Sequence, residues 1–442
     1  MKKNLKLLAA LFIGITLLSC SDDDPILPNP PSANIKSLGG GEEIAQNDTL
    51  YLIAEINSSE EATHSWLIDN QVVEAGDTLA FVSGEVGNHE IVLKASNAGG
   101  EYSTTFSVSV FGKYRDGVWV LNEGNMTSEN GTLIFISSKG VATDSVYQKV
   151  NGSELGNSTQ DLFIADGKMY IMAQNGDRAG GDGMLVVANA ETLEKEVAYS
   201  NAELEALSWP THVAVVGNSA YIRDNAGVYL LNLESKELTF VDGTSGAMKN
   251  RMAVVNGKVF VPAGKKVFVL QDGQLKGEIE LPGTLSGIVR SADDKLLVSC
   301  NGTPSYVLKI DPADNSTIQQ NEVADVRISA GWGASPAIGA KGDTVYFSSS
   351  TKIYRHILET GETKEMTDVK NHIENAGIVY NNLGVHPISG EVYFNTIKGY
   401  GLDFLINDIT VFNFSSETPV LVKDFKDYTN FPAGIFFTDN FR

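Results

Sequence analysis

Histidines and acidic side chains are the residues of this chain that could support hydrolytic or lyase chemistry. Glu123 could pair with Asp224 or Asp403 as the two carboxylates of a glycosidase, but nothing in their spacing favours this over solvated loop acids. No His-x-x-x-His or Gly-x-Ser-x-Gly motif is present. We therefore predict a protein that is not an enzyme and that has no cofactor and no metal site. The histidines are scattered, at His64, His89, His212, His356, His372 and His386.

Cys20 ends a pattern that is typical of lipid attachment. Three lysines precede an apolar run from Leu7 to Leu18, and Ser19 and Cys20 complete a small-residue cleavage box. The apolar run is too short to cross a bilayer, which needs roughly 20 residues. We therefore predict that residues 1–19 are a signal peptide and that Cys20 carries the lipid that anchors the mature protein to a membrane without spanning it.

An acidic and proline-rich segment, residues 20–31, follows the cleavage box. Ser21 to Asp24 contains three consecutive aspartates, and Pro25 to Pro31 has the composition of an extended linker. The acidic part resembles the export signal of Bacteroidota lipoproteins, which implies an outer-membrane protein that faces the cell exterior. The alternative is a solvated acidic tether with no export role.

The charge and cysteine content narrow the function classes further. The chain has 55 acidic and 33 basic residues, and loss of the three lysines of the signal peptide would take the net charge from −22 to −25. Such a field disfavours nucleic-acid binding. Of the two cysteines, Cys20 is the predicted lipid site, so Cys300 has no partner for a disulfide within the chain.

Residues 32–112 have the pattern of a small β-sandwich. Apolar residues alternate with polar ones along Thr49 to Ile56, and similar short strands are separated by turn residues such as Asn97 to Gly100. Ser65 to Asp69 and Gly87 to Asn97 resemble immunoglobulin-like domains of the polycystic-kidney-disease-repeat (PKD) type. That resemblance implies a core position for Trp66. A glycan-binding role for this aromatic side chain is the alternative.

Residues 113–442 repeat an apolar strand, a tight turn, a second apolar strand and then a looser pair of strands. The turn residues are 50, 40, 37, 48 and 48 positions apart, which matches a four-stranded propeller blade. They are Gly167, Gly217, Gly257, Asp294, Gly342 and Gly390.

Six complete repeats are followed by a single strand, Phe431 to Phe436. Its missing partners lie at the start of the repeat region, in Gly117–Asn122, Gly131–Ile136 and Asp144–Val150. Pairing the last strand with these segments would close the ring and remove an exposed sheet edge. The sequence thus predicts an all-β protein in which an immunoglobulin-like sandwich precedes a seven-bladed β-propeller.

The segments Val118–Asn125, Asn151–Asp161 and Phe431–Phe436 resemble the opening and the ending of a family of surface propellers from Bacteroidota. The wider relatives are the YVTN-type, quinoprotein-dehydrogenase-like propellers. Several members of the family sit beside TonB-dependent outer-membrane transporters, and the best understood kind captures cobalamin. The added N-terminal sandwich is a departure from the simplest of these proteins.

A binding site is predicted on the propeller face where the first strands begin and the second strands end, because loops from all blades converge there. The residues at these positions are rich in amides and aromatics, which suits an uncharged polar ligand with apolar faces, such as a corrinoid or a sugar. Turn formation, packing between blades and inter-blade salt bridges are the alternative roles. The candidates are Asn122, Asn125, Gln160, Asn175, Trp209, Arg223, Asp224, Arg251, Asn301, Trp332, Tyr400 and Phe431.

The leading hypothesis is a cell-surface lipoprotein that captures a small nutrient, a corrinoid first, for a TonB-dependent transporter. Glycan binding is the second hypothesis. A propeller lyase or glycosidase and a purely adhesive role in the envelope are the remaining ones.

Overall fold

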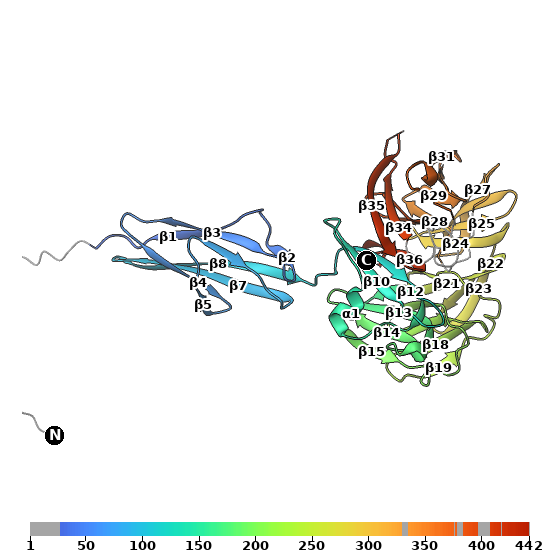
Figure 1. Ribbon diagram of the computed structural model, residues 1–442, viewed down its shortest axis with the longest axis horizontal. Coiled ribbons are helices and arrows are strands. Elements are labelled where there is room, and N and C mark those ends of the chain that lie inside the picture. The colour runs from blue at the N-terminus through green and yellow to red at the C-terminus, as the bar shows by residue number, and fades with distance from the viewer. Residues whose placement is uncertain are drawn as a thin grey trace, which may run out of the picture. The chain divides into compact units, whose positions relative to one another are not determined.

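The computed structural model describes residues 27–328, 335–374, 376–377, 383–396, 407–416 and 418–441. The predicted signal peptide, Cys20 and the acidic residues that follow it lie outside this range. The chain divides into two compact units, one ending at Phe111 and the other beginning at Gly112 (Figure 1). Each unit is described by itself.

The N-terminal unit consists of two sheets that share one core. Trp66 is fully buried between them, and its indole Nε1 donates a hydrogen bond to the carbonyl oxygen of Gly76 at 2.9 Å. A core role for Trp66 is therefore confirmed, and its burial removes it as a glycan platform. The smaller sheet contains β1 (Ser32–Ser37), β3 (Leu50–Asn57) and β6 (Thr78–Phe81), and the larger one contains β2 (Glu43–Ala45), β8 (Gly100–Phe111), β7 (Gly87–Asn97), β4 (Thr63–Ile68) and β5 (Gln71–Val73).

The period-2 pattern of the sequence determines which side chains enter this core. Ile91, Leu93 and Ala95 on β7 are buried, whereas the residues between them are more exposed. Because successive side chains of a strand point to opposite faces, one face of the larger sheet is apolar and the other is polar.

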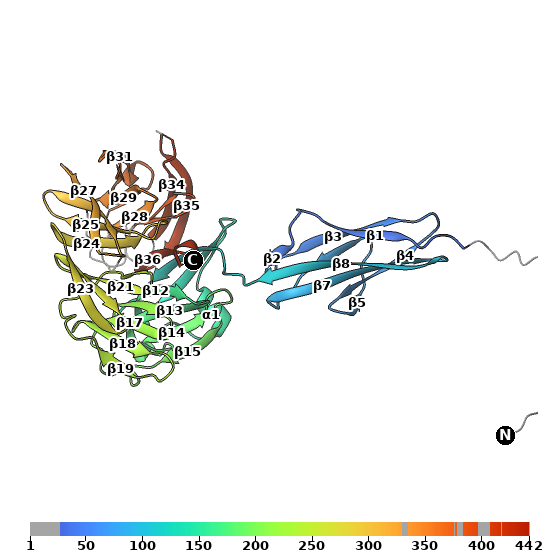
Figure 2. The same cartoon turned by 180° about the vertical axis from the view of Figure 1, so that it is seen from behind.

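The described residues of the second unit form seven four-stranded antiparallel sheets arranged as a propeller. Consecutive strands of one blade include β17, β18 and β19, which are labelled in Figure 2. From the innermost strand outward, the blades are β12 (Asn157–Ala165), β13 (Lys168–Gly176), β14 (Leu185–Asn189), β15 (Lys195–Tyr199); β16 (His212–Val216), β17 (Ser219–Arg223), β18 (Val228–Asn232), β19 (Leu238–Phe240); β20 (Ala253–Val255), β21 (Lys258–Ala263), β22 (Lys266–Gln271), β23 (Gln274–Glu280); β24 (Thr284–Arg290), β25 (Leu296–Asn301), β26 (Ser305–Asp311), β27 (Ser316–Val323); β28 (Ile338–Lys341), β29 (Thr344–Ser349), β30 (Lys352–Ile357), β31 (Thr363–Asp368); β32 (Leu383–Val385), β33 (Val392–Thr396), β34 (Asn407–Asn413), β35 (Val420–Thr429); and β36 (Pro432–Phe437), β9 (Gly117–Asn122), β10 (Thr132–Ser137), β11 (Ala142–Thr143).

The ring is closed by the C-terminal strand β36, which pairs with β9 and supplies the innermost strand of the blade that the N-terminal end of this unit completes. The innermost strands contact one another in the cyclic order β12, β16, β20, β24, β28, β32 and β36. The predicted propeller and its closure are therefore confirmed. We call the end of the ring where these seven strands begin the entry end, and the end where they finish the exit end.

One predicted strand is wrong. Asp144–Val150 was expected to be the outer strand of the closing blade, but Val146–Asn151 forms the short helix α1 and the two-residue β11 takes the outer position. Val146 and Tyr147 are buried and Val150 packs against the same core, a spacing that fits one face of a helix rather than one face of a strand.

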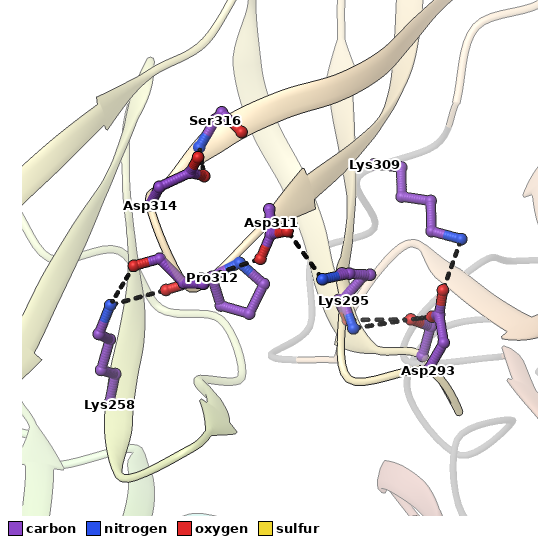
Figure 3. Close-up of polar contacts among 10 residues, drawn as sticks. Lys258, Asp293, Lys295, Lys309, Asp311, Pro312, Asp314 and Ser316 are labelled. Atoms are coloured by element: carbon purple, nitrogen blue, oxygen red, sulfur yellow. Dashed lines mark hydrogen bonds and ion pairs between the residues drawn. The ribbon is translucent and has the colours of Figure 1, made fainter.

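Lysine side chains link neighbouring blades at the exit end (Figure 3). Lys258 Nζ donates to the carbonyl oxygen of Pro312 in the next blade at 2.7 Å. Lys309 Nζ lies 2.8 Å from a carboxylate oxygen of Asp293 in its own blade and 2.6 Å from one of Asp343 in the following blade. These contacts add to the apolar packing between the sheets and help to fix the position of each blade relative to the next.

Candidate ligand-binding site on the propeller axis

The entry end of the ring contains an unusual concentration of buried polar side chains. The first five residues of β12, from Asn157 to Asp161, are all polar and all buried. Thr159 donates through its hydroxyl to the carbonyl oxygen of Asn122 on the closing blade. A strand of this composition needs hydrogen-bond partners at every position, because an unsatisfied buried polar group is costly.

Several carboxamide oxygens at this end accept no hydrogen bond from the described part of the chain. Among them are those of Asn122, Gln160 and Asn250, which are 2%, 3% and 7% exposed. The side-chain nitrogens of Asn122 and Asn250 are used, donating to Thr132 and to the carbonyl of Ser286. These three residues therefore offer acceptors that a ligand with N–H or O–H groups could satisfy.

Two cationic side chains accompany these amides. Arg223 is held in place by hydrogen bonds to the carbonyl of Ala247 at 3.1 Å and to the Thr211 hydroxyl at 3.2 Å. Burial lowers the pKa of Lys249, with the Glu123 carboxylate acting in the opposite direction and Arg223 adding to the lowering. Within the described ranges Lys249 has no hydrogen-bond or ion-pair partner. The sequence analysis did not select Lys249, since a lysine in a loop before a strand carries no distinctive signal.

Asp161 and Arg251 form a buried ion pair near the axis. Asp161 Oδ1 lies 3.4 Å from Arg251 Nε, and neither atom makes a hydrogen bond within the described residues. The other carboxylate oxygen of Asp161 accepts from the backbone N–H of Val213 at 3.2 Å. Burial raises the pKa of the Asp161 carboxyl to about 7, although the Arg251 guanidinium acts to lower it.

Arg251 reaches across the ring from the blade of β20. Its guanidinium carbon lies 3.9 Å from the centre of the Phe436 ring, and its Nη2 contacts the Ser335 hydroxyl at 3.5 Å. Gly434 leaves room for this arrangement, because a Cβ there would lie 2.7 Å from Arg251 Nη2. Arg251 therefore contacts side chains from three other blades.

An axial cavity of about 320 Å³ lies on the exit side of this arginine. The ends of the inner strands form its walls, and the short 3₁₀ helix η4 (Thr438–Phe441) contributes Asn440 and Phe441. A smaller adjoining space shares Arg251, Arg290 and Asn440 with it and extends to β28, β32 and β36. Arg251 was chosen from the sequence as an entry-end residue, but its side chain lines the opposite side of the axis.

Several other predicted residues have their polar atoms engaged in local structure. The Asp224 carboxylate accepts from the backbone N–H groups of Ser208, Ala226 and Gly227, so it shapes a turn, which opposes its use in a glycosidase dyad. The side-chain oxygen of Asn125 similarly accepts hydrogen bonds from the backbone N–H and the hydroxyl of Thr127.

Asn175 donates to Asn157 at 2.7 Å, and Asn301 accepts from Arg327 at 2.7 Å. Trp209 is 54% exposed with a positive φ of 56°. Phe431 also has a positive φ, of 49°, and its backbone carbonyl oxygen accepts a hydrogen bond from the backbone N–H of Glu123. Trp332, Tyr400 and Asp403 lie outside the described residues.

No group of three or more His, Cys, Asp or Glu side chains that could hold a metal ion occurs in the described ranges. Among the helices described, none is long and apolar enough to cross a membrane.

The sheets described above define the second unit as a β-propeller. The chain belongs to the family described as Domain of unknown function (DUF5074), whose model matches residues 116–438. No curated protein matches the sequence.

The structure is similar to that of a quinoprotein alcohol dehydrogenase-like protein from Bacteroides thetaiotaomicron VPI-5482. The TM-score is 0.56 at 17% identity, and the match covers 93% of this chain and 100% of that one. At this identity the likeness confirms the fold alone.

Weaker matches include PorZ, a surface component of the type-IX secretion system of Porphyromonas gingivalis, with a TM-score of 0.38, 13% identity and coverage of 77% and 44% of the two chains. The WD40 propeller domain of Doa1 matches with a TM-score of 0.42, 12% identity and coverage of 62% and 84%.

Proposed function

We propose that this protein is a cell-surface lipoprotein, anchored through Cys20, that captures a small nutrient at the entry end of its propeller. A corrinoid is the first candidate ligand, and a TonB-dependent outer-membrane transporter is the proposed recipient. The sandwich is proposed to be an immunoglobulin-like spacer between the anchor and the binding unit.

The observation that supports this proposal is the set of three buried carboxamide oxygens, on Asn122, Gln160 and Asn250, that accept no hydrogen bond from the described residues. A corrinoid carries peripheral primary amides, whose N–H groups are donors suited to such acceptors. Binding would remove the cost of leaving these oxygens unsatisfied.

Isothermal titration calorimetry of the lipoprotein in detergent with cyanocobalamin tests the proposal. We expect micromolar or tighter binding, weakened at least fivefold by Asn250→Ala. Asn413→Ala, which changes an asparagine at the exit end of β34, is the matched control and should bind normally. Absence of both heat and a shift in melting temperature at micromolar cyanocobalamin would reject the corrinoid as ligand.

Glycan binding is the second candidate function, and Trp209 is the observation that favours it. This side chain is 54% exposed beside the entry end, where a flat aromatic surface could stack on a sugar ring. A glycan array with the wild type, Trp209→Ala and the control Tyr51→Ala tests this candidate. Signals that disappear only in Trp209→Ala would favour glycan binding, and an empty array would exclude it.

The proposed location and partner need separate measurements. Mass spectrometry of the mature N-terminus should find acyl chains on Cys20, and Cys20→Ala should release the protein from the membrane fraction. Cross-linking in whole cells should recover a TonB-dependent transporter. Recovery of other envelope components alone would favour an adhesive role.

A further inference from the structure

The axial cavity on the exit side of Arg251 has the walls and the polar end of a binding site for a small organic acid. Its walls combine polar groups with the apolar side chains of Phe163, Val254, Ile288 and Phe436, so an apolar body would contact aliphatic and aromatic carbon on part of its surface. At about 320 Å³ the cavity is near the lower limit of small-molecule sites, which span roughly 300–1,000 Å³. It is therefore suited to a ligand with a single ring or a short branched chain.

Arg251 supplies the polar end of this cavity and has hydrogen-bonding capacity to spare. A guanidinium has five N–H donors. Within the described residues, Arg251 makes one long hydrogen bond, to Ser335, and its Nε faces Asp161 at 3.4 Å without forming one. Its side chain is 21% exposed and lines the cavity.

The guanidinium is also fixed in position before any ligand binds. It stacks at 3.9 Å on the Phe436 ring and lies against Gly434, where a side chain would collide with it. A preorganised guanidinium loses little side-chain entropy on binding, and its planar fork matches a carboxylate in a bidentate manner.

The charges around the cavity select the kind of anion. Arg290, on the rim, is paired with Asp294, whose Oδ1 lies 2.6 Å from its Nη2. Asp161 lies beside Arg251, and Asp166 also lines the cavity. These acidic groups disfavour a dianion such as phosphate more than a monoanion, because like charges repel at short range.

We propose that the axial cavity binds a small monocarboxylate with an apolar body, an arylacetic or branched aliphatic acid, with its carboxylate on Arg251. This site is separate from the entry-end site of the proposed function, and a corrinoid is far too large for it. Failure of either site would leave the other unaffected.

Calorimetry with phenylacetate on the full chain tests this inference, with 2-phenylethanol as the neutral probe and inorganic phosphate as the dianion. We expect phenylacetate to bind at least tenfold more tightly than either of the others. Equal binding of the alcohol, or no binding of phenylacetate at millimolar concentration, would overturn the proposal.

Two variants locate the site. Arg251→Met removes the cation, and because this residue also connects blades, a second variant keeps the test independent of folding. Val254→Trp fills the cavity from a half-buried position without removing Arg251. We expect it to weaken phenylacetate binding at least tenfold with an unchanged circular dichroism spectrum. Val141→Trp, at a 60% exposed position, is the matched control. Unchanged affinity in folded Val254→Trp would show that phenylacetate binds elsewhere.

Discussion

The propeller of Asp161→Asn should become more stable relative to that of the wild type as the pH rises, even though the substitution breaks an ion pair. Asp161 is 1% exposed, and burial raises its pKa from 3.8 to about 7 against the opposing effect of Arg251. The folded state therefore holds this proton more tightly than the unfolded chain does. The wild type consequently loses stability as the pH rises from about 4 to about 7, and the asparagine variant has no such group to ionise.

The magnitude follows from the difference between the two pKa values. A difference of about three units at 1.36 kcal/mol each gives about 4 kcal/mol. The free energy of unfolding of Asp161→Asn minus that of the wild type should thus increase by about this amount between pH 4 and pH 8. This agrees with the general finding that buried ion pairs are often less stabilising than their neutral replacements.

Urea unfolding of the full-length protein at several pH values, followed by the propeller transition, measures this difference. Asp272→Asn, in an exposed turn of the same unit, is the control and should show no comparable trend. If the wild type instead gains stability relative to Asp161→Asn as the pH rises, the attraction of Arg251 outweighs burial and the reasoning is refuted.

Other predictions concern packing and exposed charge. Gly434→Ala should destabilise the propeller by about 1–3 kcal/mol in urea unfolding, because the new Cβ would meet Arg251 Nη2 at 2.7 Å; a neutral effect would mean that this guanidinium is free to move. Lys309→Met should cost about 1 kcal/mol at low salt, since its two aspartate partners are about half exposed, and most of the cost should disappear near 1 M NaCl. A cost independent of salt would indicate lost packing instead. In the N-terminal unit, burial lowers the pKa of His89 but hydrogen bonds to Asp69 and Glu85 outweigh it and raise the pKa overall. The stability that His89 contributes is therefore present below pH 6.5 and lost as the pH rises through its folded pKa, so calorimetry should find His89→Gln most destabilising in acid. A variant that is equally destabilised at pH 5.5 and 8.5 would contradict this.

The propeller was predictable because turn residues, as well as apolar strands, recur in each repeat. All six turn positions that define the repeat have φ between 54° and 78°, a region that glycine and aspartate tolerate better than most residues. The positions of the inner strands follow from these turns. The closure of β36 on β9 was predictable for a different reason, namely that an unpaired apolar strand at each end of a repeat array requires a partner.

Helix α1 was missed because seven residues do not distinguish the two periodicities. The spacing of Val146, Tyr147 and Val150 fits one face of a helix, but three apolar positions in so short a segment are weak evidence, and the packing of Tyr147 against the neighbouring blade decides. The Tyr147 hydroxyl donates to Asp182 at 2.6 Å, a contact between residues 35 positions apart that no local pattern contains.

The candidate site was predictable as a location but not as a set of contacts. The amides Asn122 and Gln160 are at the entry end as their strand positions require, because the backbone determines where a strand begins and ends. Which polar atoms stay unsatisfied depends on partners that are distant in the sequence. The Asp224 carboxylate accepts hydrogen bonds within a turn, whereas the pKa of Lys249, a loop residue with no motif, is influenced by Glu123 and Arg223.

Arg251 shows that, at the axis of a propeller, the place of a residue in its strand does not determine where its side chain ends. Seven strands converge there, so a long side chain that begins at one end of one strand can contact several blades and reach the other side of the ring. Its contacts with Asp161, Ser335 and Phe436 join the blades of β12, β28 and β36, the last of which closes the ring. A carboxylate held by this guanidinium would bind the folded ring and not the unfolded chain. Its binding free energy should therefore stabilise the propeller transition and leave that of the N-terminal unit unchanged.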